Sequence, residues 1–211
     1  MNVVGIGAHP DDIEIGAGGS VAMHRAQGHT VEFIVLTSGG ELSEEGRRER
    51  ECERAGDILD VDTLHFLRYT DTEVSYEGEL VKRIDDILEA ADADRVYIHS
   101  EKDTHQDHRN AALASIAAAR NVDEVMSFES PSTRSSFAPQ YYSPLSEAVL
   151  NRKIEAIRAH ESQSEKKYLE AEAMRGLARF RGRQANTRYA EAFQVIRIKE
   201  SPAEKHGAVR R

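Results

Sequence analysis

The sequence predicts an α/β fold, a Rossmann-like three-layer arrangement with helices on both faces of a mostly parallel sheet. Short apolar runs rich in β-branched residues alternate with longer amphipathic runs along most of the chain. Strands separated by helices imply βαβ units, in which successive strands lie parallel in one sheet. We expect the strand order 3-2-1-4-5, which places the first and fourth strands side by side.

Each element follows from its own periodicity. The strands are short and apolar, as in TVEFIVL at 30–36, and in chain order we expect them at residues 2–7, 30–36, 63–67, 95–99, 122–128 and 190–198. The helices repeat apolar side chains every three or four residues, as Leu80, Ile84 and Leu88 do. In chain order we expect them at residues 18–27, 44–59, 78–91, 106–119, 144–160 and 163–181. Residues 130–144, rich in Ser, Pro and Tyr, are expected to form a loop.

Composition favours a single domain over residues 1–198, with a polar tail at 199–211. The 211 residues are 39% hydrophobic, enough for one core. The net charge of −9 argues against nucleic acid as a partner, because an acidic surface repels phosphate backbones. A homo-oligomer stays open. Cys52 is the only cysteine, no apolar run approaches the ~20 residues of a membrane helix, and the first residues do not resemble a signal peptide. We therefore expect a cytoplasmic protein without membrane insertion.

Two polar clusters carry the chemistry. The first, His9, Asp11, Asp12 and Glu14, follows the first strand, and the second, at 105–108 (HQDH), follows the fourth. In the expected strand order both clusters reach the crevice at the carboxyl ends of adjacent strands, where α/β sheets bind ligands. Either cluster alone could merely cap a helix, but their convergence favours a functional site.

Two imidazoles and a carboxylate form a common catalytic zinc set that leaves one position for water. A second carboxylate and a second histidine are then available for acid–base work, so every part of metal-assisted amide hydrolysis is present. The same donors also suit iron(II). Gly5 and Gly7 resemble the start of a dinucleotide fingerprint, but Pro10 stands where its third glycine should be. We instead expect the glycines at 16–19 to fold the loop tightly onto the next helix.

The AHPDD motif at 8–12, its continuation to AHPDDIEIGAGG, and HQDH at 105–108 resemble the LmbE/PIG-L family of zinc-dependent N-deacetylases. The similarity reaches residue 198, and the long first motif is especially similar to the branch that contains bacillithiol-pathway deacetylases. The resemblance implies a small-molecule N-acetyl sugar or sugar conjugate as substrate, with hydrolysis of its acetamide. A metal hydrolase of another amide or ester, and a non-catalytic sugar- or nucleotide-sugar-binding protein, remain alternatives.

The resemblance also implies residue roles. His9, Asp12 and His108 would bind zinc, and Asp11 would be the general base. His105 would stabilise the tetrahedral intermediate or protonate the leaving amine, and Asp107 would orient His105. The remaining implied roles are sugar contacts from Arg48 and Asp71, support of the loop by Glu14 and a gating tyrosine at Tyr141 or Tyr142. Gln106 departs from the proline usual in the second motif. Apart from the resemblance, His99 closes the fourth strand and could support the site, whereas His24, His29, His65 and His160 are interpreted as structural or surface residues.

Overall fold

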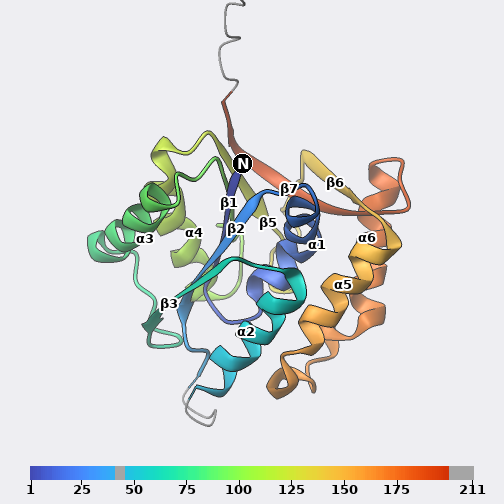
Figure 1. The fold of residues 1–211 in the computed structure, drawn as a ribbon, viewed down its shortest axis with the longest axis horizontal. Coiled ribbons are helices and arrows are strands. Elements are labelled where there is room, and N and C mark those ends of the chain that lie inside the picture. The colour runs from blue at the N-terminus through green and yellow to red at the C-terminus, as the bar shows by residue number, and fades with distance from the viewer. Residues whose placement is uncertain (41–45, 200–211) are drawn as a thin grey trace, which may run out of the picture.

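A mixed sheet lies at the centre of the computed structural model, which describes residues 1–40 and 46–199 (Figure 1). Within these residues the strand order is β3-β2-β1-β4-β5-β7-β6, which confirms the expected 3-2-1-4-5 arrangement and extends it. The strands are β1 Asn2–Gly7, β2 Thr30–Thr37, β3 Thr63–Tyr69, β4 Arg95–Ile98, β5 Glu124–Phe128, β6 Tyr141–Leu145 and β7 Tyr189–Ile198. The strands β1 to β5 pair in parallel, whereas β7 runs antiparallel to both β5 and β6.

Helices cover both faces of the sheet (Figure 1). They are α1 Asp12–Ala26, α2 Arg47–Leu59, α3 Gly78–Ala90, α4 Gln106–Ala118, α5 Glu147–Arg158 and α6 Ala171–Gln184, with short 3-10 turns η1 Ala119–Asn121, η2 Glu161–Gln163 and η3 Lys167–Leu169. Alternate residues of β1 separate the two layers: Val4 and Ile6 pack towards α3 and α4, and Val3 packs towards α1 and α2. A third apolar cluster joins α1, α5 and α6.

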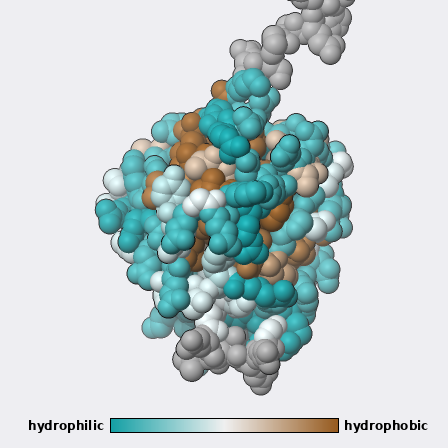
Figure 2. All heavy atoms as spheres, turned by 90° about the vertical axis from the view of Figure 1, so that its left-hand side faces the viewer, coloured by the Kyte–Doolittle hydropathy of each residue, from teal (hydrophilic) through white to brown (hydrophobic). Residues whose placement is uncertain are grey.

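The outer surface over α3 and α4 is largely hydrophilic, with scattered apolar atoms between the polar side chains (Figure 2). Charged residues such as Lys82 and Asp86 form ion pairs along α3. No helix in the described part of the chain is both long enough and apolar enough to cross a bilayer.

The first helix corrects the sequence interpretation. α1 begins at Asp12, directly after the HPD turn, and not at residue 18. Gly16 and Gly19 therefore lie inside the helix, where a Cβ on Gly16 would overlap the Phe128 ring and one on Gly19 would crowd Leu145. These glycines permit close helix packing and do not form a loop. Gly5 serves the same purpose in β1, since a Cβ there would lie 2.7 Å from Ile13.

A second correction concerns the expected loop at 130–144. Its end forms β6, an edge strand that pairs with β7 and contains Pro144. Proline is tolerated at a sheet edge, where its missing N–H costs no ladder hydrogen bond. The next helix, α5, then begins at Glu147, because Ser146 caps it by accepting a hydrogen bond from the Val149 N–H at 3.2 Å. The expected tail lies outside the described residues apart from Lys199.

Candidate metal and active site

The two polar clusters meet at the carboxyl ends of β1 and β4, which are neighbours in the sheet. A cavity of about 350 Å³ opens there. Its lining consists of His9, Asp11, Asp12, Ile15, Arg48, Asp71, Thr72, His105, His108, Ser130, Pro131, Ser132, Lys166 and Tyr168. Seven of the eight predicted site residues line this cavity, and the eighth, Asp107, is buried beneath it.

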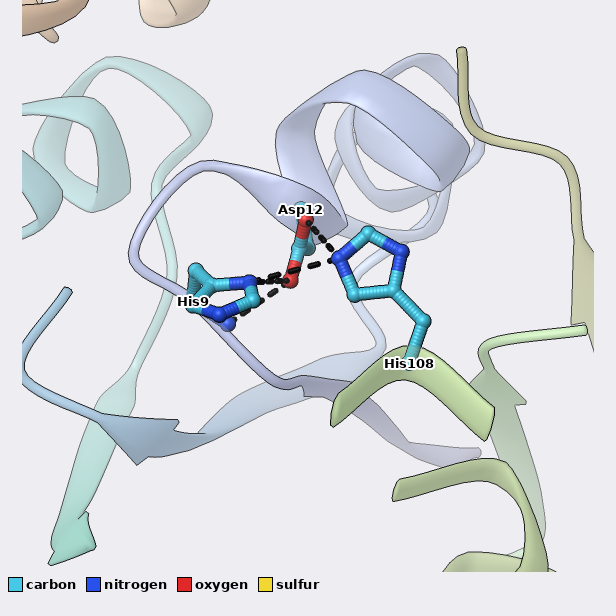
Figure 3. Close-up of side chains that lie close together, drawn as sticks. All are labelled: His9, Asp12 and His108. Atoms are coloured by element: carbon cyan, nitrogen blue, oxygen red, sulfur yellow. Dashed lines mark hydrogen bonds and ion pairs between the residues drawn. The ribbon is translucent and has the colours of Figure 1, made fainter. Parts of the chain in front are cut away.

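His9, Asp12 and His108 form a compact triad (Figure 3). The Nδ1 atom of His9 lies 3.2 Å from the Asp12 carboxylate and 3.3 Å from Nε2 of His108, and that Nε2 lies 3.4 Å from the second Asp12 oxygen. A tetrahedral ion bound at about 2.0–2.1 Å holds its ligand atoms roughly 3.3 Å apart. The three donors are thus spaced as a divalent metal requires.

The outer nitrogens of both histidines face carboxylates. Nε2 of His9 lies 3.0 Å from Asp71 and 3.3 Å from Asp107, and Nδ1 of His108 lies 3.2 Å from Asp103. A proton held on each outer nitrogen leaves the inner lone pair for a metal. Burial alone would lower both pKa values, but the carboxylates, led by Asp12, raise the pKa of His9 to about 12 and that of His108 to about 9. The site therefore favours positive charge.

Asp12 is fixed from several sides. Its carboxylate accepts a hydrogen bond from the His9 backbone N–H at 2.7 Å and lies 3.0 Å from Nε2 of His99. Burial would raise its pKa, but the positive charge of His108, His99 and His9 holds the pKa well below its ordinary value. The His99 ring stacks on His108 at a centroid distance of 4.1 Å. The structure thus places His99 directly behind two of the proposed ligands.

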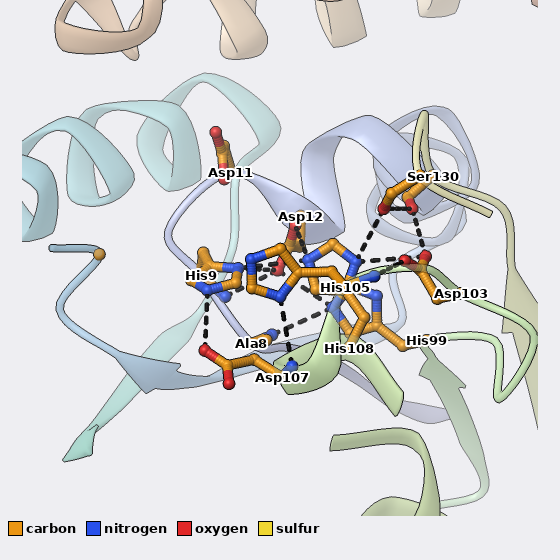
Figure 4. Close-up of polar contacts among 12 residues, drawn as sticks. Ala8, His9, Asp11, Asp12, His99, Asp103, His105, Asp107, His108 and Ser130 are labelled. Atoms are coloured by element: carbon orange, nitrogen blue, oxygen red, sulfur yellow. Dashed lines mark hydrogen bonds and ion pairs between the residues drawn. The ribbon is translucent and has the colours of Figure 1, made fainter. Parts of the chain in front are cut away.

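Asp11 stands apart from the interactions that join the other residues in Figure 4. Its Oδ1 lies 3.1 Å from Nη2 of Arg48, and both side chains are buried in the cavity wall. Arg48 also donates from Nη1 to the Gly39 carbonyl at 2.7 Å. Gly39 has φ +79°, and a Cβ there would overlap the guanidinium, so both its backbone conformation and the contact require glycine. Arg48 therefore holds the Asp11 carboxylate beside the triad, and Asp11 is not one of the three metal-spaced donors.

His105 caps α4, and its Nδ1 accepts a hydrogen bond from the Asp107 backbone N–H at 3.2 Å. The neutral ring therefore carries its proton on Nε2. Burial and the positive charge of His108 and His9 lower the pKa of His105. The Asp107 carboxylate contacts His9 and accepts from the Thr72 N–H at 2.7 Å, so in the described structure it is the Asp107 backbone that orients His105.

Several residues were not identified from sequence. Asp103 is fully buried and joins His108 to the Ser130 and Thr133 hydroxyls. Burial alone would raise the pKa of Asp103, but hydrogen bonds from His108, from neighbouring hydroxyls and from a backbone N–H hold this pKa well below its ordinary value. Ser132, Lys166 and Tyr168 line the cavity from later segments. Of these residues, only Asp103 could have been suspected from the sequence, because it lies between the fourth strand and the HQDH motif.

Two smaller expectations change, and Gln106 gains a defined contact. Tyr141 and Tyr142 lie in β6 and do not line the cavity, whereas Tyr168 does. Glu14 packs behind the site, where its carboxylate bonds to the buried ring of His160 at 3.0 Å. Gln106 is the first residue of α4, where the expected helix begins, and its side-chain amide donates to the Thr72 carbonyl at 2.6 Å. Gln106 therefore fastens the loop that carries Asp71.

A family model for GlcNAc-PI de-N-acetylase (PIG-L) matches residues 4–119, which span both motifs. The chain belongs to the PIG-L deacetylase family. The chain is similar to the uncharacterised deacetylase YaiS of Escherichia coli, with 32% identity over 167 residues that cover 76% of this chain and 90% of YaiS. The diacetylchitobiose deacetylase of Thermococcus kodakarensis is 28% identical over 221 residues, covering 92% of this chain and 82% of that protein.

Solved structures share the fold of this PIG-L family chain. The conserved protein TT1542 from Thermus thermophilus has a TM-score of 0.85 at 24% identity and covers 97% of this chain and 99% of its own. GalB, the 4-carboxy-2-hydroxymuconate hydratase of Pseudomonas putida, has a TM-score of 0.81 at 23% identity, covering 96% and 100%. A diacetylchitobiose deacetylase from Pyrococcus horikoshii also shares the fold, with a TM-score of 0.79 at 24% identity. Since one fold carries both a deacetylase and a hydratase, the reaction must be argued from the site.

Proposed function

We propose that this PIG-L family chain is a zinc-dependent N-deacetylase that hydrolyses the acetamide of an N-acetylated amino sugar or its conjugate, releasing acetate and the free amine. The observation that carries the proposal is the metal-spaced triad with an additional buried carboxylate, Asp11, in the wall of the same cavity. The diacetylchitobiose deacetylase supports the choice of substrate class.

The donor set fits a divalent ion held by His9, Asp12 and His108, and zinc is the ion that most often takes such ligands. Iron(II) is the runner-up, since two histidines and one carboxylate also suit it. When bound, the ion polarises the amide carbonyl and lowers the pKa of water from about 15.7 to about 7. The outer carboxylates keep both histidines in the tautomer that the ion requires.

Asp11 is placed to act as general base. Its carboxylate takes a proton from the attacking water, while Arg48 fixes the orientation of the Asp11 side chain. The Nε2–H of His105 then donates to the oxyanion that forms as water attacks the carbonyl. A proton passed on from Asp11 or from His105 lets the amine leave.

Arg48 and Asp71 are proposed to contact the sugar hydroxyls. Both line the cavity, and each already has an ion-pair partner in the protein, Asp11 for Arg48 and His9 for Asp71, while Arg48 also donates to the Gly39 carbonyl. Their remaining donors and acceptors are available to a ligand, as the guanidinium has five N–H groups and a carboxylate has about four lone-pair sites.

The decisive experiment is a deacetylation assay on N-acetylglucosamine and N,N′-diacetylchitobiose, with bound metal quantified alongside and products identified by mass spectrometry. We expect loss of an acetyl group that stops on chelation. Asp11→Asn should lower kcat by about 100-fold or more while the metal content is retained, and His108→Ala should lose both. A metal-loaded protein without activity on any N-acetyl sugar would favour another amide or ester as substrate. Sugar affinity without turnover of either kind would indicate a binding protein.

A further inference from the structure

A second cavity, of about 220 Å³, lies at the end of the sheet opposite to the metal triad. It opens at the amino ends of three strands, since Met1 precedes β1, His29 precedes β2 and Arg95 is the first residue of β4. The last turns of α1 and the strand β6 complete its wall. This second cavity shares no lining residue with the metal cavity, so it is a separate site on the molecule.

The charge of its wall differs from that of the metal cavity. Among the described residues no carboxylate lines the second cavity, whereas three carboxylates line the metal cavity. The guanidinium of Arg95 is bound by Glu124 through Nε and Nη2 only. Its third nitrogen, Nη1, makes a long contact of 3.4 Å to the buried Tyr97 hydroxyl. A chain with a net charge of −9 therefore has here a cation in a cavity wall that contains no anion.

Two imidazoles face each other beside Arg95, and their neighbours determine where the ring protons lie. Nε2 of the buried His24 lies 3.0 Å from the Tyr97 hydroxyl and 3.5 Å from Nη1 of Arg95, which has only hydrogens to offer. That Nε2 atom is therefore an acceptor, and a neutral His24 carries its proton on Nδ1. The Nδ1 atoms of His24 and His29 lie 2.9 Å apart, so His29 accepts there and carries its own proton on Nε2.

Both rings are neutral at pH 7, as this arrangement of protons requires. Burial, followed by the positive charge of Arg95, lowers the pKa of His24 to about 4. Burial and nearby positive charge also lower the pKa of His29, against the opposing effect of Asp94. Within the described part of the chain, the Nε2–H group of the half-buried His29 has no hydrogen-bond partner. The chain of hydrogen bonds therefore ends in a free donor at the same cavity as the guanidinium.

We propose that the second cavity binds a small oxyanion, a phosphate or a carboxylate group, between Arg95 and His29. Nη1 of Arg95 donates to one oxygen of the ligand, and the Nε2–H of His29 donates to another. Tyr141 supports the guanidinium, which lies 5.6 Å from the centroid of its ring. The volume is below the range of cavities for drug-sized ligands, so it suits one charged group or a small metabolite. This site does not depend on the proposed deacetylase function.

Nitrogen-15 NMR of the histidine rings in the metal-loaded protein tests the site, because it reports the tautomer of each ring. Before any anion is added, we expect His24 protonated on Nδ1 and His29 on Nε2. Titration with inorganic phosphate, and separately with acetate, at an ionic strength kept constant with sodium chloride, should then shift the signals of both rings until they saturate. Saturation by phosphate alone would assign a phosphate group, and saturation by both anions would assign oxyanions in general.

Arg95→Met should weaken oxyanion affinity about tenfold or more, the size of one charge-assisted hydrogen bond. Arg120→Met is the matched control, because it removes a positive charge that pairs with Asp85 outside the cavity. His29→Ala, followed through the His24 signals, should weaken the affinity as well, and it leaves the Arg95–Glu124 ion pair in place if Arg95→Met does not fold.

Three results would overturn the oxyanion site. The first is the reverse pair of tautomers, which would make the outer nitrogen of His29 an acceptor. The second is a set of shifts that chloride reproduces, or that phosphate causes only at His9 and His108, since these would report ionic strength or the metal cavity. The third is an oxyanion affinity that His29→Ala leaves unchanged, or that Arg120→Met lowers as much as Arg95→Met does.

Discussion

Each histidine of the triad uses its two ring nitrogens differently. One nitrogen points to the space between the three donors, and the other points to a carboxylate, Asp71 and Asp107 for His9 and Asp103 for His108. The carboxylates favour one tautomer and one ring orientation for each histidine, so the proposed ligand role of both rings depends on these carboxylates. The Asp103 carboxylate itself accepts hydrogen bonds from the Ser130 and Thr133 hydroxyls and from the His105 backbone N–H.

The first prediction concerns Asp103, which acts through His108. Asp103→Asn keeps the size of the side chain but removes the charge that holds the His108 proton on Nδ1. We expect zinc affinity to fall by about 10- to 100-fold, measured by competition with a chelator of known affinity. Glu101→Gln is the control, because it removes an exposed charge from the same segment. Equal affinities for the wild-type protein and Asp103→Asn would contradict the role assigned to Asp103.

At this scale the sequence predicted which side chains come together better than it predicted the partners of those side chains. The residues of both motifs fall where the strand order requires, and the triad geometry fits a metal. The partners of these residues were harder to predict because they come from other segments. The Asp107 carboxylate contacts His9, whereas His105 receives only the Asp107 backbone N–H. Lys166 reaches the cavity from a segment that the sequence patterns placed in a helix over 163–181, but α6 begins only at Ala171 and a short 3-10 turn precedes it.

Among the elements, α1 depends on glycine for its packing against the sheet. It presents Gly16 to Phe128 of β5 and Gly19 to Leu145 of β6, so the helix axis lies close to the sheet. This closeness also positions Asp12, the first residue of the helix, beside the ends of β1 and β4. The packing of one helix face and the geometry of the triad are therefore linked.

The second prediction tests this packing. Gly16→Ala should destabilise the protein by about 1–3 kcal/mol, because a methyl group forces the Phe128 ring or the helix to move. Gly176→Ala, in the exposed part of α6 with open space around its Cα, should instead stabilise by about 0.5–1 kcal/mol through helix propensity. Denaturant unfolding of both variants measures the difference. A Gly16→Ala protein as stable as wild type would show that α1 does not need this close approach.

The elements also show where sequence patterns stop. Alternation of apolar strands and amphipathic helices predicted β1 to β5, because local periodicity determines each of them, and the topology of doubly wound sheets predicted their order. The start of α1 was missed because glycine usually disfavours helices, whereas here it serves packing against Phe128. The strand β6 was missed because Pro144 and the polar residues around it are typical of a loop. Its strand conformation depends on pairing with β7, which the local sequence does not indicate.

For the whole molecule, the parallel topology is what creates the site. His9 and His108 lie 99 positions apart, yet β1 and β4 are neighbours and their carboxyl ends bring the two rings together. The resulting cluster combines two histidines with buried carboxylates. The negative charge of these carboxylates can be balanced by protons on the two rings or by a metal ion between them. Protons and metal ions therefore compete for the same nitrogens.

The last prediction follows from this competition. In metal-free protein the pKa values of His9 and His108 are raised from 6.5 to about 12 and about 9, so both rings are charged at neutral pH. A raised pKa stabilises the folded state fully below 6.5, and this stabilisation is lost as pH rises through 9 and then 12. A metal ion needs both inner nitrogens deprotonated, so binding must release protons and its affinity must rise with pH. We expect about two protons released per zinc ion at pH 7, one from each ring.

Calorimetric titration of zinc into chelator-treated protein, repeated in buffers of different ionisation enthalpy, counts these protons. His65→Gln should release as many protons as wild type, because this half-buried histidine pairs with Glu32 away from the cavity. The thermal stability of metal-free protein should decline from about pH 6.5 upwards, whereas zinc should stabilise the protein more strongly over the same range. Zinc binding that releases no protons would mean that the two rings are neutral before the ion arrives, and that the surrounding carboxylates orient the ligands without charging them.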